Sequence, residues 1–78
     1  MTQGELDKLL ALAIAQARGI KIPVSDKIDP QVRLNRRART RFGCCILRDG
    51  AYTIELSAQL AREGTRDAVL QVLAHEVL

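Results

Sequence analysis

The chain has 78 residues, enough for one small domain, and 47% of them are hydrophobic. That fraction is ordinary for a globular protein and too high for a disordered tail. The formal net charge of +3 is a mild basic bias, and no run approaches the roughly 20 apolar residues of a membrane span. The composition therefore indicates a globular domain, with no membrane among its expected partners.

A helix is predicted over residues 2–17. Thr2 and Glu5 form a capping-box pattern at its start, and Gly19 suits the C′ position after its end. Apolar residues recur with the i, i+3, i+4, i+7 spacing of one helix face: Leu6, Leu9, Leu10, Ala13, Ile14 and Ala17. This stripe is expected to make core contacts and to carry no chemistry.

An export signal is the alternative for the same segment, because Ala15 and Ala17 have the spacing of a small-x-small cleavage site. The acidic residues at the start outnumber the basic one, whereas export signals begin with net positive charge.

Cys44 and Cys45 are adjacent, and neighbours on a strand point to opposite faces, so they are poor disulfide partners. We therefore expect a reducing, cytoplasmic location.

Two short segments after the helix have strand character. Residues 20–24 are mostly apolar but contain Pro23, which cannot donate a ladder hydrogen bond, so an edge strand is expected there. Residues 31–36 alternate, with Val32 and Leu34 on one face, as in a half-buried strand. The sheet is thus expected to begin near residue 20.

A hairpin is predicted at Asp49-Gly50, which separates two strand-like runs, residues 42–48 and 51–57. A type I′ turn needs positive φ at both central residues, and Asp-Gly supplies it. The sheet is therefore expected over about residues 20–57. The order helix, strands, helix predicts an α+β fold, with a small mixed or antiparallel sheet in one domain over residues 1–78.

The last helix is predicted over about residues 65–78, with Thr65 as its N-cap. It is apolar on most sides, like a helix buried in the centre of a domain. His75 and Glu76 lie inside it, where an unpaired polar group would be costly. No capping residue, Gly or Pro follows before the chain stops at Leu78.

The pattern H-E-x-x-H on a helix places two histidines one turn apart on one face, where both reach one Zn²⁺. The Glu between them accepts a proton from a metal-bound water as that water attacks a carbonyl. This chain supplies His75, Glu76 and two further residues, and the second histidine of the pattern would come next. The alternative is a structural pair, in which His75 bonds a backbone carbonyl and Glu76 reaches solvent or one of the arginines Arg39, Arg41 and Arg66.

Four segments carry a family resemblance: Asn35-Arg36-Arg37-Ala38, Arg41-Phe42-Gly43-Cys44-Cys45, Tyr52-Thr53-Ile54-Glu55-Leu56-Ser57 and Val72-Leu73-Ala74-His75-Glu76-Val77-Leu78. In order and spacing they resemble the SprT-like, or Spartan-type, zinc metalloproteases. That family's pattern is N-x-R-x-x-x-R-[FW]-G-x-C, a hairpin ending in I-x-[IL]-[SN], and an L-x-H-E-x-x-H helix. The resemblance covers about residues 20–78.

The resemblance implies a minimal zinc protease domain, of which this chain is the N-terminal part, broken inside the metal helix. It implies His75 as the first zinc ligand and Glu76 as the general base of peptide-bond hydrolysis. The second helix histidine and the third, downstream histidine of the family have no counterpart here. We therefore expect zinc in the complete protein, no zinc held by this fragment, and no protease activity from the fragment itself.

Two contacts are expected for such a fragment. A protein or peptide substrate would pair with the strand before the metal helix, residues 51–57, by β-addition. The alternative is that this strand is only half of the hairpin. Absence of the rest of the domain would expose the apolar side of the last helix. We expect self-association through Val69, Leu73, Val77 and Leu78.

Five arginines crowd one short segment: Arg33, Arg36, Arg37, Arg39 and Arg41. They could form a phosphate-binding stripe, and the resemblance implies that some family members act on proteins bound to DNA. No aromatic residue interleaves with them, so base stacking is not expected. The alternative is a solvated strand edge that charge protects from aggregation. In that case Arg36 and Arg41 form ion pairs. Glu55 and Glu63 are the expected carboxylates.

Protease and non-catalytic functions therefore make different predictions. The alternative to a SprT-like protease is a small basic module that binds nucleic acid or protein without catalysis. A histidine directly after Leu78 in the gene supports the protease. DNA affinity that falls with rising salt supports the nucleic-acid module.

Overall fold

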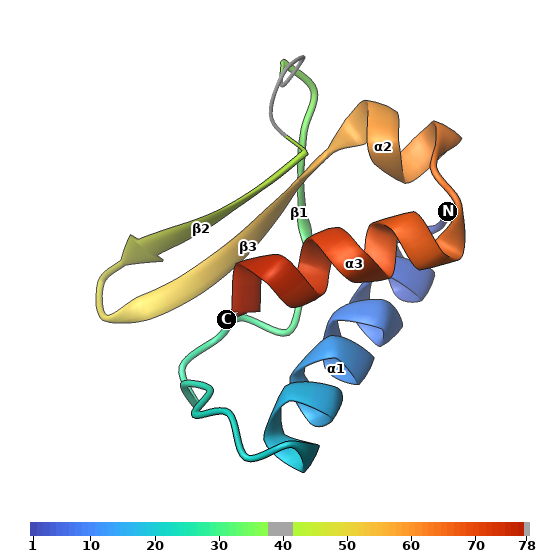
Figure 1. Ribbon diagram of the computed structural model, residues 1–78. Coiled ribbons are helices and arrows are strands. Elements are labelled where there is room, and N and C mark those ends of the chain that lie inside the picture. The colour runs from blue at the N-terminus through green and yellow to red at the C-terminus, as the bar shows by residue number, and fades with distance from the viewer. Residues whose placement is uncertain (38–41, 78) are drawn as a thin grey trace.

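The computed structural model describes residues 1–37 and 42–77. In chain order its elements are α1 (Gln3–Gly19), β1 (Arg33–Asn35), β2 (Gly43–Arg48), β3 (Ala51–Ser57), α2 (Ala58–Glu63) and α3 (Arg66–Val77). The strands form one mixed sheet in the order β1-β3-β2, with β1 parallel and β2 antiparallel to β3. The predicted α+β fold is confirmed (Figure 1). None of the helices in the described ranges is long and apolar enough to cross a membrane.

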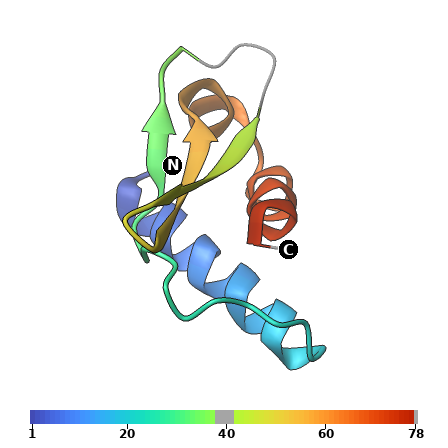
Figure 2. The same cartoon turned by 90° about the vertical axis from the view of Figure 1, so that its left-hand side faces the viewer.

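The helix α3 is the centre of the packing. It lies against β2 and β3 on one face of the sheet, and α1 packs against α3 (Figures 1 and 2). The fully buried side chains come from both helices, from β3 and from the residue before β1: Leu6, Leu10, Val32, Ile54, Leu56, Val69 and Leu73. Along β3 the buried residues alternate with half-buried Thr53 and Glu55, so the other face of the sheet is the open one.

The start of α1 has the predicted capping box. The Thr2 hydroxyl accepts a hydrogen bond from the Glu5 N–H at 3.2 Å, and the Glu5 carboxylate accepts one from the Thr2 N–H at 3.1 Å. The backbone bond from Thr2, followed by the bond from its side chain, lowers the pKa of the Glu5 carboxyl. Local sequence therefore fixes where the helix begins.

The end of α1 differs from the prediction. Gly19 is the last helical residue, and the C′ position belongs to Lys21, whose φ is 63°. The N–H groups of Lys21 and Ile22 each donate a 3.0 Å hydrogen bond to carbonyl oxygens in the last turn of α1, which makes a Schellman motif. The chain then continues without regular structure, so residues 20–24 do not form the expected edge strand.

Replacing Lys21 by glycine is expected to raise the free energy of unfolding by about 0.5–1 kcal/mol, because the left-handed region disfavours a residue with a Cβ. The greater freedom of glycine in the unfolded chain offsets part of that gain. Urea denaturation measures the change. Lys27→Gly is the matched control, because Lys27 is not among the residues with positive φ, and it should be neutral or destabilising. A Lys21→Gly chain less stable than the original would contradict the left-handed conformation.

The strands follow the prediction at the hairpin and depart from it at β1. The strand β1 occupies only three residues, Arg33–Asn35. Val32 is buried while Leu34 is 39% exposed, so these two do not share one buried face. In the hairpin turn φ is 53° at Asp49 and 78° at Gly50, the positive values that a type I′ turn requires.

A short helix, α2, directly follows β3 and is absent from the sequence prediction. Ser57 caps it, since its hydroxyl accepts a hydrogen bond from the Leu60 N–H at 3.4 Å. After α2 the helix α3 begins as predicted, because the Thr65 hydroxyl accepts a hydrogen bond from the Ala68 N–H at 3.1 Å. The connection between hairpin and last helix is thus itself helical.

The apolar side of α3 is covered within the chain. Val69 and Leu73 are fully buried and Val77 is 8% exposed, because they belong to the core shared with α1 and β3. The predicted exposure of these side chains is wrong, and Leu78 lies outside the described residues. Three of the four side chains proposed for self-association are therefore buried among the described residues. The oligomeric state stays a prediction.

Candidate functional site

The last turn of α3 carries the two residues of the predicted catalytic pair. His75 is exposed, whereas Glu76 is half-buried and contacts the start of β2. The burial cost expected for an unpaired histidine in this helix does not apply, because water can solvate the imidazole. That exposure also leaves the imidazole ring accessible to a ligand.

Gly43, the first residue of β2, meets α3 at close range. A Cβ added to Gly43 would lie 2.7 Å from Val72 Cγ1 and 3.1 Å from Glu76 Cγ, too short for ordinary van der Waals contact. Only a residue without a side chain lets the helix approach so closely. The glycine of the Arg41-Phe42-Gly43 motif therefore has a packing role that holds Glu76 against β2.

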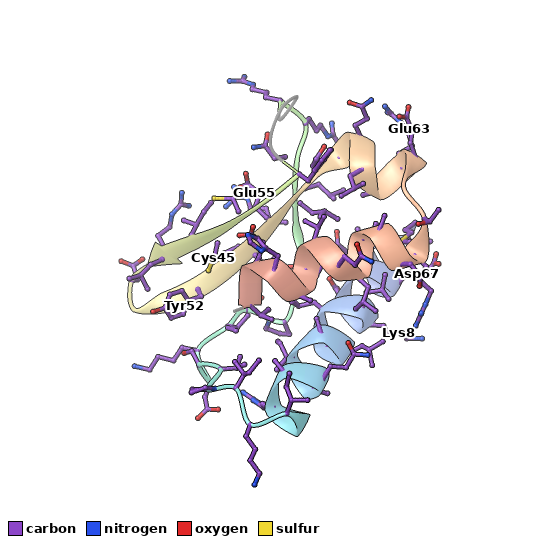
Figure 3. All side chains as sticks on the ribbon, in the orientation of Figure 1. Lys8, Cys45, Tyr52, Glu55, Glu63 and Asp67 are labelled. Carbon is purple, nitrogen blue, oxygen red and sulfur yellow. The ribbon has the colours of Figure 1, made fainter. Side chains whose placement is uncertain are left out.

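Cys45 shares a pocket of about 230 Å³ with Glu76. The remaining lining residues are Pro23, Ser25, Ile28, Tyr52 and Val77. Figure 3 shows Cys45 on the α3 side of the hairpin and Glu55 on the other side. Cys45 is an exposed residue, but partial desolvation of its thiol raises the pKa, and the negative charge of Glu76 and the neighbouring Cys44 add to that rise. The thiol is therefore kept protonated near neutral pH.

Replacing Glu76 by glutamine is expected to lower the pKa of the Cys45 thiol, because it removes a charge that disfavours the thiolate. Thiolate forms as pH rises, so the variant should be alkylated faster at about pH 8. Iodoacetamide kinetics followed by mass spectrometry, in a Cys44→Ser background, measure the rate. Glu63→Gln on α2 is the control and should leave it unchanged. Equal rates with and without the Glu76 carboxylate would show that its charge does not act on the Cys45 thiol.

A complete metal site is not formed by the described residues. Over ranges 1–37 and 42–77, no group of three or more His, Cys, Asp or Glu side chains is placed to hold a metal ion. Catalytic zinc takes three protein ligands and a water, and His75 supplies a single imidazole. The described residues therefore do not fit a whole zinc centre. An exposed imidazole beside a half-buried carboxylate does fit one ligand and the base of such a centre.

Three arginines of the predicted stripe belong to the described part of the chain. Arg33 lies on β1, and Arg36 and Arg37 lie in the turn that follows it, all three exposed. Arg39 and Arg41 lie outside the described residues. The structure therefore places one of the five arginines at the start of β1 and two directly after its end.

The ion pair expected for Arg36 is not formed. Glu55 accepts a hydrogen bond from the Asn35 side-chain amide at 2.7 Å, and Glu63 lies 3.8 Å from Arg62. The salt bridges within the described part of the chain involve Arg18 and Arg62. Arg36 is thus an exposed charge in the turn after β1, and the ion pair expected for Arg41 lies outside the described residues.

The strand predicted to pair with a substrate has no open edge. The strand β3 is central: β1 pairs with residues 55–57, and β2 pairs along the other side. The Tyr52 backbone N–H donates a hydrogen bond to the Lys27 carbonyl oxygen, and the Tyr52 carbonyl oxygen accepts one from the Asp29 N–H, so the start of β3 is also bonded on the β1 side. The interpretation of residues 51–57 as the substrate strand is therefore wrong. The edge strand next to α3 is β2 (Figure 2).

In every second residue of β2 the backbone N–H and C=O groups point to that open edge. The Phe42 carbonyl oxygen accepts a hydrogen bond from the Ser57 N–H at 2.8 Å, which fixes the even-numbered residues as those bonded to β3. Gly43, Cys45 and Leu47 therefore direct their N–H and C=O groups away from β3. Since the α3 side of the sheet is where a side chain on Gly43 would point, the side chains of Cys45 and Leu47 lie on that side as well.

The family model of the SprT-like family matches residues 14–78. The matched range includes the hairpin, Gly43 and the whole of α3. The chain belongs to the SprT-like family. No curated protein and no solved structure gave a match. The SprT-like resemblance seen in the sequence motifs is thereby confirmed, and the match also includes the end of α1, which the motifs do not reach.

Three neighbours of Glu76 in this SprT-like chain were not identified as site residues from sequence: Gly43, Cys45 and Tyr52. A signal for the first two was present, because the G-x-C spacing on a strand places them on one face. Tyr52 follows only from the hairpin register, which pairs it with Leu47. Part of the pocket beside Glu76, the predicted base, could therefore be predicted from the motif.

Proposed function

We propose that this SprT-like chain is part of a zinc-dependent metallopeptidase, in which His75 is the first metal ligand and Glu76 is the general base. The observation that carries the proposal is the position of Glu76, half-buried against Gly43 with the exposed His75 beside it. Zinc, when bound, supplies a polarised water. The chain's own contribution is a carboxylate that accepts a proton next to the open edge of the sheet.

An extended peptide is the proposed substrate, and β2 is the proposed strand that binds it. The outward backbone groups of Gly43, Cys45 and Leu47 offer the hydrogen bonds that an added strand needs. Because Glu76 contacts Gly43 at one end of this row, a peptide paired there would pass close to the carboxylate. This replaces β3, whose edges are occupied, as the substrate strand.

The complete protein is the test of the proposal. It requires a histidine directly after Leu78, about one zinc per chain, and hydrolysis of peptides. His75→Ala should remove the zinc. Gln71→Ala is the matched control, because Gln71 is also exposed and lies one turn earlier on α3. Any other residue after Leu78, or peptide hydrolysis by a zinc-free protein, would overturn the proposal.

Nucleic-acid binding is a second candidate, favoured by the exposure of Arg36 and Arg37 in one turn. Changing both to glutamine should reduce the slope of log affinity for DNA against log salt by about 2, because each phosphate contact contributes about 0.9. Filter binding or fluorescence anisotropy over a salt series measures the slope. Arg62→Gln on α2 is the control, since Arg62 lies beside Glu63. An unchanged slope would exclude this turn as the contact.

A further inference from the structure

The three residues of β2 that face α3 differ sharply in size. Gly43 has no side chain, Cys45 has a small one, and Leu47 is large and 61% exposed. A single exposed leucine on a surface needs no explanation. Leu47, however, belongs to a strand with an open edge, so its free side is where an added strand would lie.

A strand added to this edge would place a side chain directly across from Leu47. Cross-strand apolar pairs stabilise strand pairing, and Leu47 already has Tyr52 as its neighbour on β3. From Gly43 to Leu47 the strand carries no charge, so nothing there repels an apolar segment. The chemistry of the edge at this end therefore fits an apolar side chain.

The Gly43 end of β2 differs from the Leu47 end because a carboxylate lies next to it. Val72 and Glu76 occupy the space that a side chain on Gly43 would need, so Glu76 lies close to the backbone at this end of β2. A peptide carboxylate across from Gly43 would meet the negative charge of Glu76 in a partly desolvated position. That end of the edge therefore disfavours an acidic side chain.

We infer that Leu47 is a specificity-determining residue, which selects an extended peptide with an apolar side chain across from it. The same peptide lacks a carboxylate across from Gly43. The inference rests on the proposed function, because it takes the β2 edge as the peptide site. Since the two positions are four residues apart on β2, the two preferences fall four residues apart on the peptide.

Peptide titration of the ¹⁵N-labelled 78-residue chain, followed by NMR, tests this selection without requiring catalysis. The probes are capped threonine-serine peptides that carry one leucine and, four positions away, a serine. The leucine peptide should shift the amide signals of Gly43, Cys45 and Leu47. It should bind about three- to fivefold more tightly than the same peptide with alanine, as expected for one cross-strand pair. Aspartate in place of the distant serine should weaken binding.

Variants of Leu47 and of a control residue show whether Leu47 causes the preference for the leucine peptide over the alanine peptide. Leu47→Thr keeps a strand-forming residue but should bring the leucine and alanine peptides to equal affinity. Leu47→Phe should keep the preference. Ile20→Thr is the control, because Ile20 is an aliphatic residue outside the sheet that is even more exposed, at 71%.

The outcomes separate the two proposals. Equal affinities of the leucine and alanine peptides for the original chain, with signals shifting along β2, would overturn the role of Leu47 and retain the β2 edge. An Ile20→Thr chain that loses the preference as Leu47→Thr does would also overturn it. No shift along β2 with any peptide would overturn both the selection and the edge site. Zinc content and hydrolysis by the complete protein decide the metallopeptidase separately.

Discussion

If the proposed function is right, glutamine in place of Glu76 is expected to lower the proposed peptidase activity of the complete protein by at least about a hundredfold and to leave its zinc content unchanged. A positioned general base contributes about 10²–10⁴ to the rate, and an amide of the same shape cannot accept the proton. Glu76 is not among the ligands proposed for the metal, so zinc should stay bound. The loss should fall on kcat, because the proton is transferred in the transition state.

The control for this result is Glu63→Gln, which removes an exposed carboxylate from α2. It should keep full activity. Both variants should unfold at the urea concentration of the original protein, because neither side chain belongs to the buried core. A Glu76→Gln protein that retains more than about a tenth of the original activity would exclude Glu76 as the general base.

Three features of the fold could be predicted because each depends on only a few neighbouring residues. The capping box of Thr2 and Glu5, the Asp49-Gly50 turn and the Thr65 cap all appear where they were predicted. Each depends on residues at most three positions apart, so a short stretch of chain contains the whole cause. The start of both long helices and the hairpin could therefore be predicted with no knowledge of packing.

The end of α1 and the helix α2 depend on more than local preference. A Schellman motif usually has glycine at C′, so Gly19 was the natural candidate, yet the chain places Lys21 there. Because that turn takes up the start of residues 20–24, the strand expected there does not form. The helix α2 is six residues long, too short for a periodic pattern to predict. Tertiary contact, such as burial of Ala61, holds it in place.

In the candidate site, too, some features follow from local sequence and others from tertiary packing. The motif identified His75 and Glu76, but their environments follow from which side of α3 packs on the sheet, and that is fixed by the close contact at Gly43. The open edge was assigned to the wrong strand because β1, distant in sequence, pairs in parallel with β3. Parallel pairing between segments about twenty residues apart leaves no local signal. Strand order could therefore not be predicted from the hairpin alone.

Alanine in place of Gly43 is expected to reduce the free energy of unfolding by about 1–3 kcal/mol, a large share of the roughly 3–5 kcal/mol that a core of this size supplies. The added Cβ would lie 2.7 Å from Val72 Cγ1, and a valine side chain on a helix has one strongly preferred rotamer. The helix must therefore move away from β2. Glu76 would move with it, so peptidase activity of the complete protein should fall as well. Urea denaturation followed by circular dichroism measures the stability change.

The matched control is Gly19→Ala, which adds the same methyl group where no atom lies within 4 Å. It should be neutral or slightly stabilising, because alanine is the better helix former. Combining Gly43→Ala with Val72→Ala removes the clashing methyl. The double variant should then be more stable than the sum of the two single changes predicts, by at least about 0.5 kcal/mol. Additive effects of the two changes would mean that the approach of α3 to β2 does not depend on Gly43, and the position of Glu76 would then need another cause.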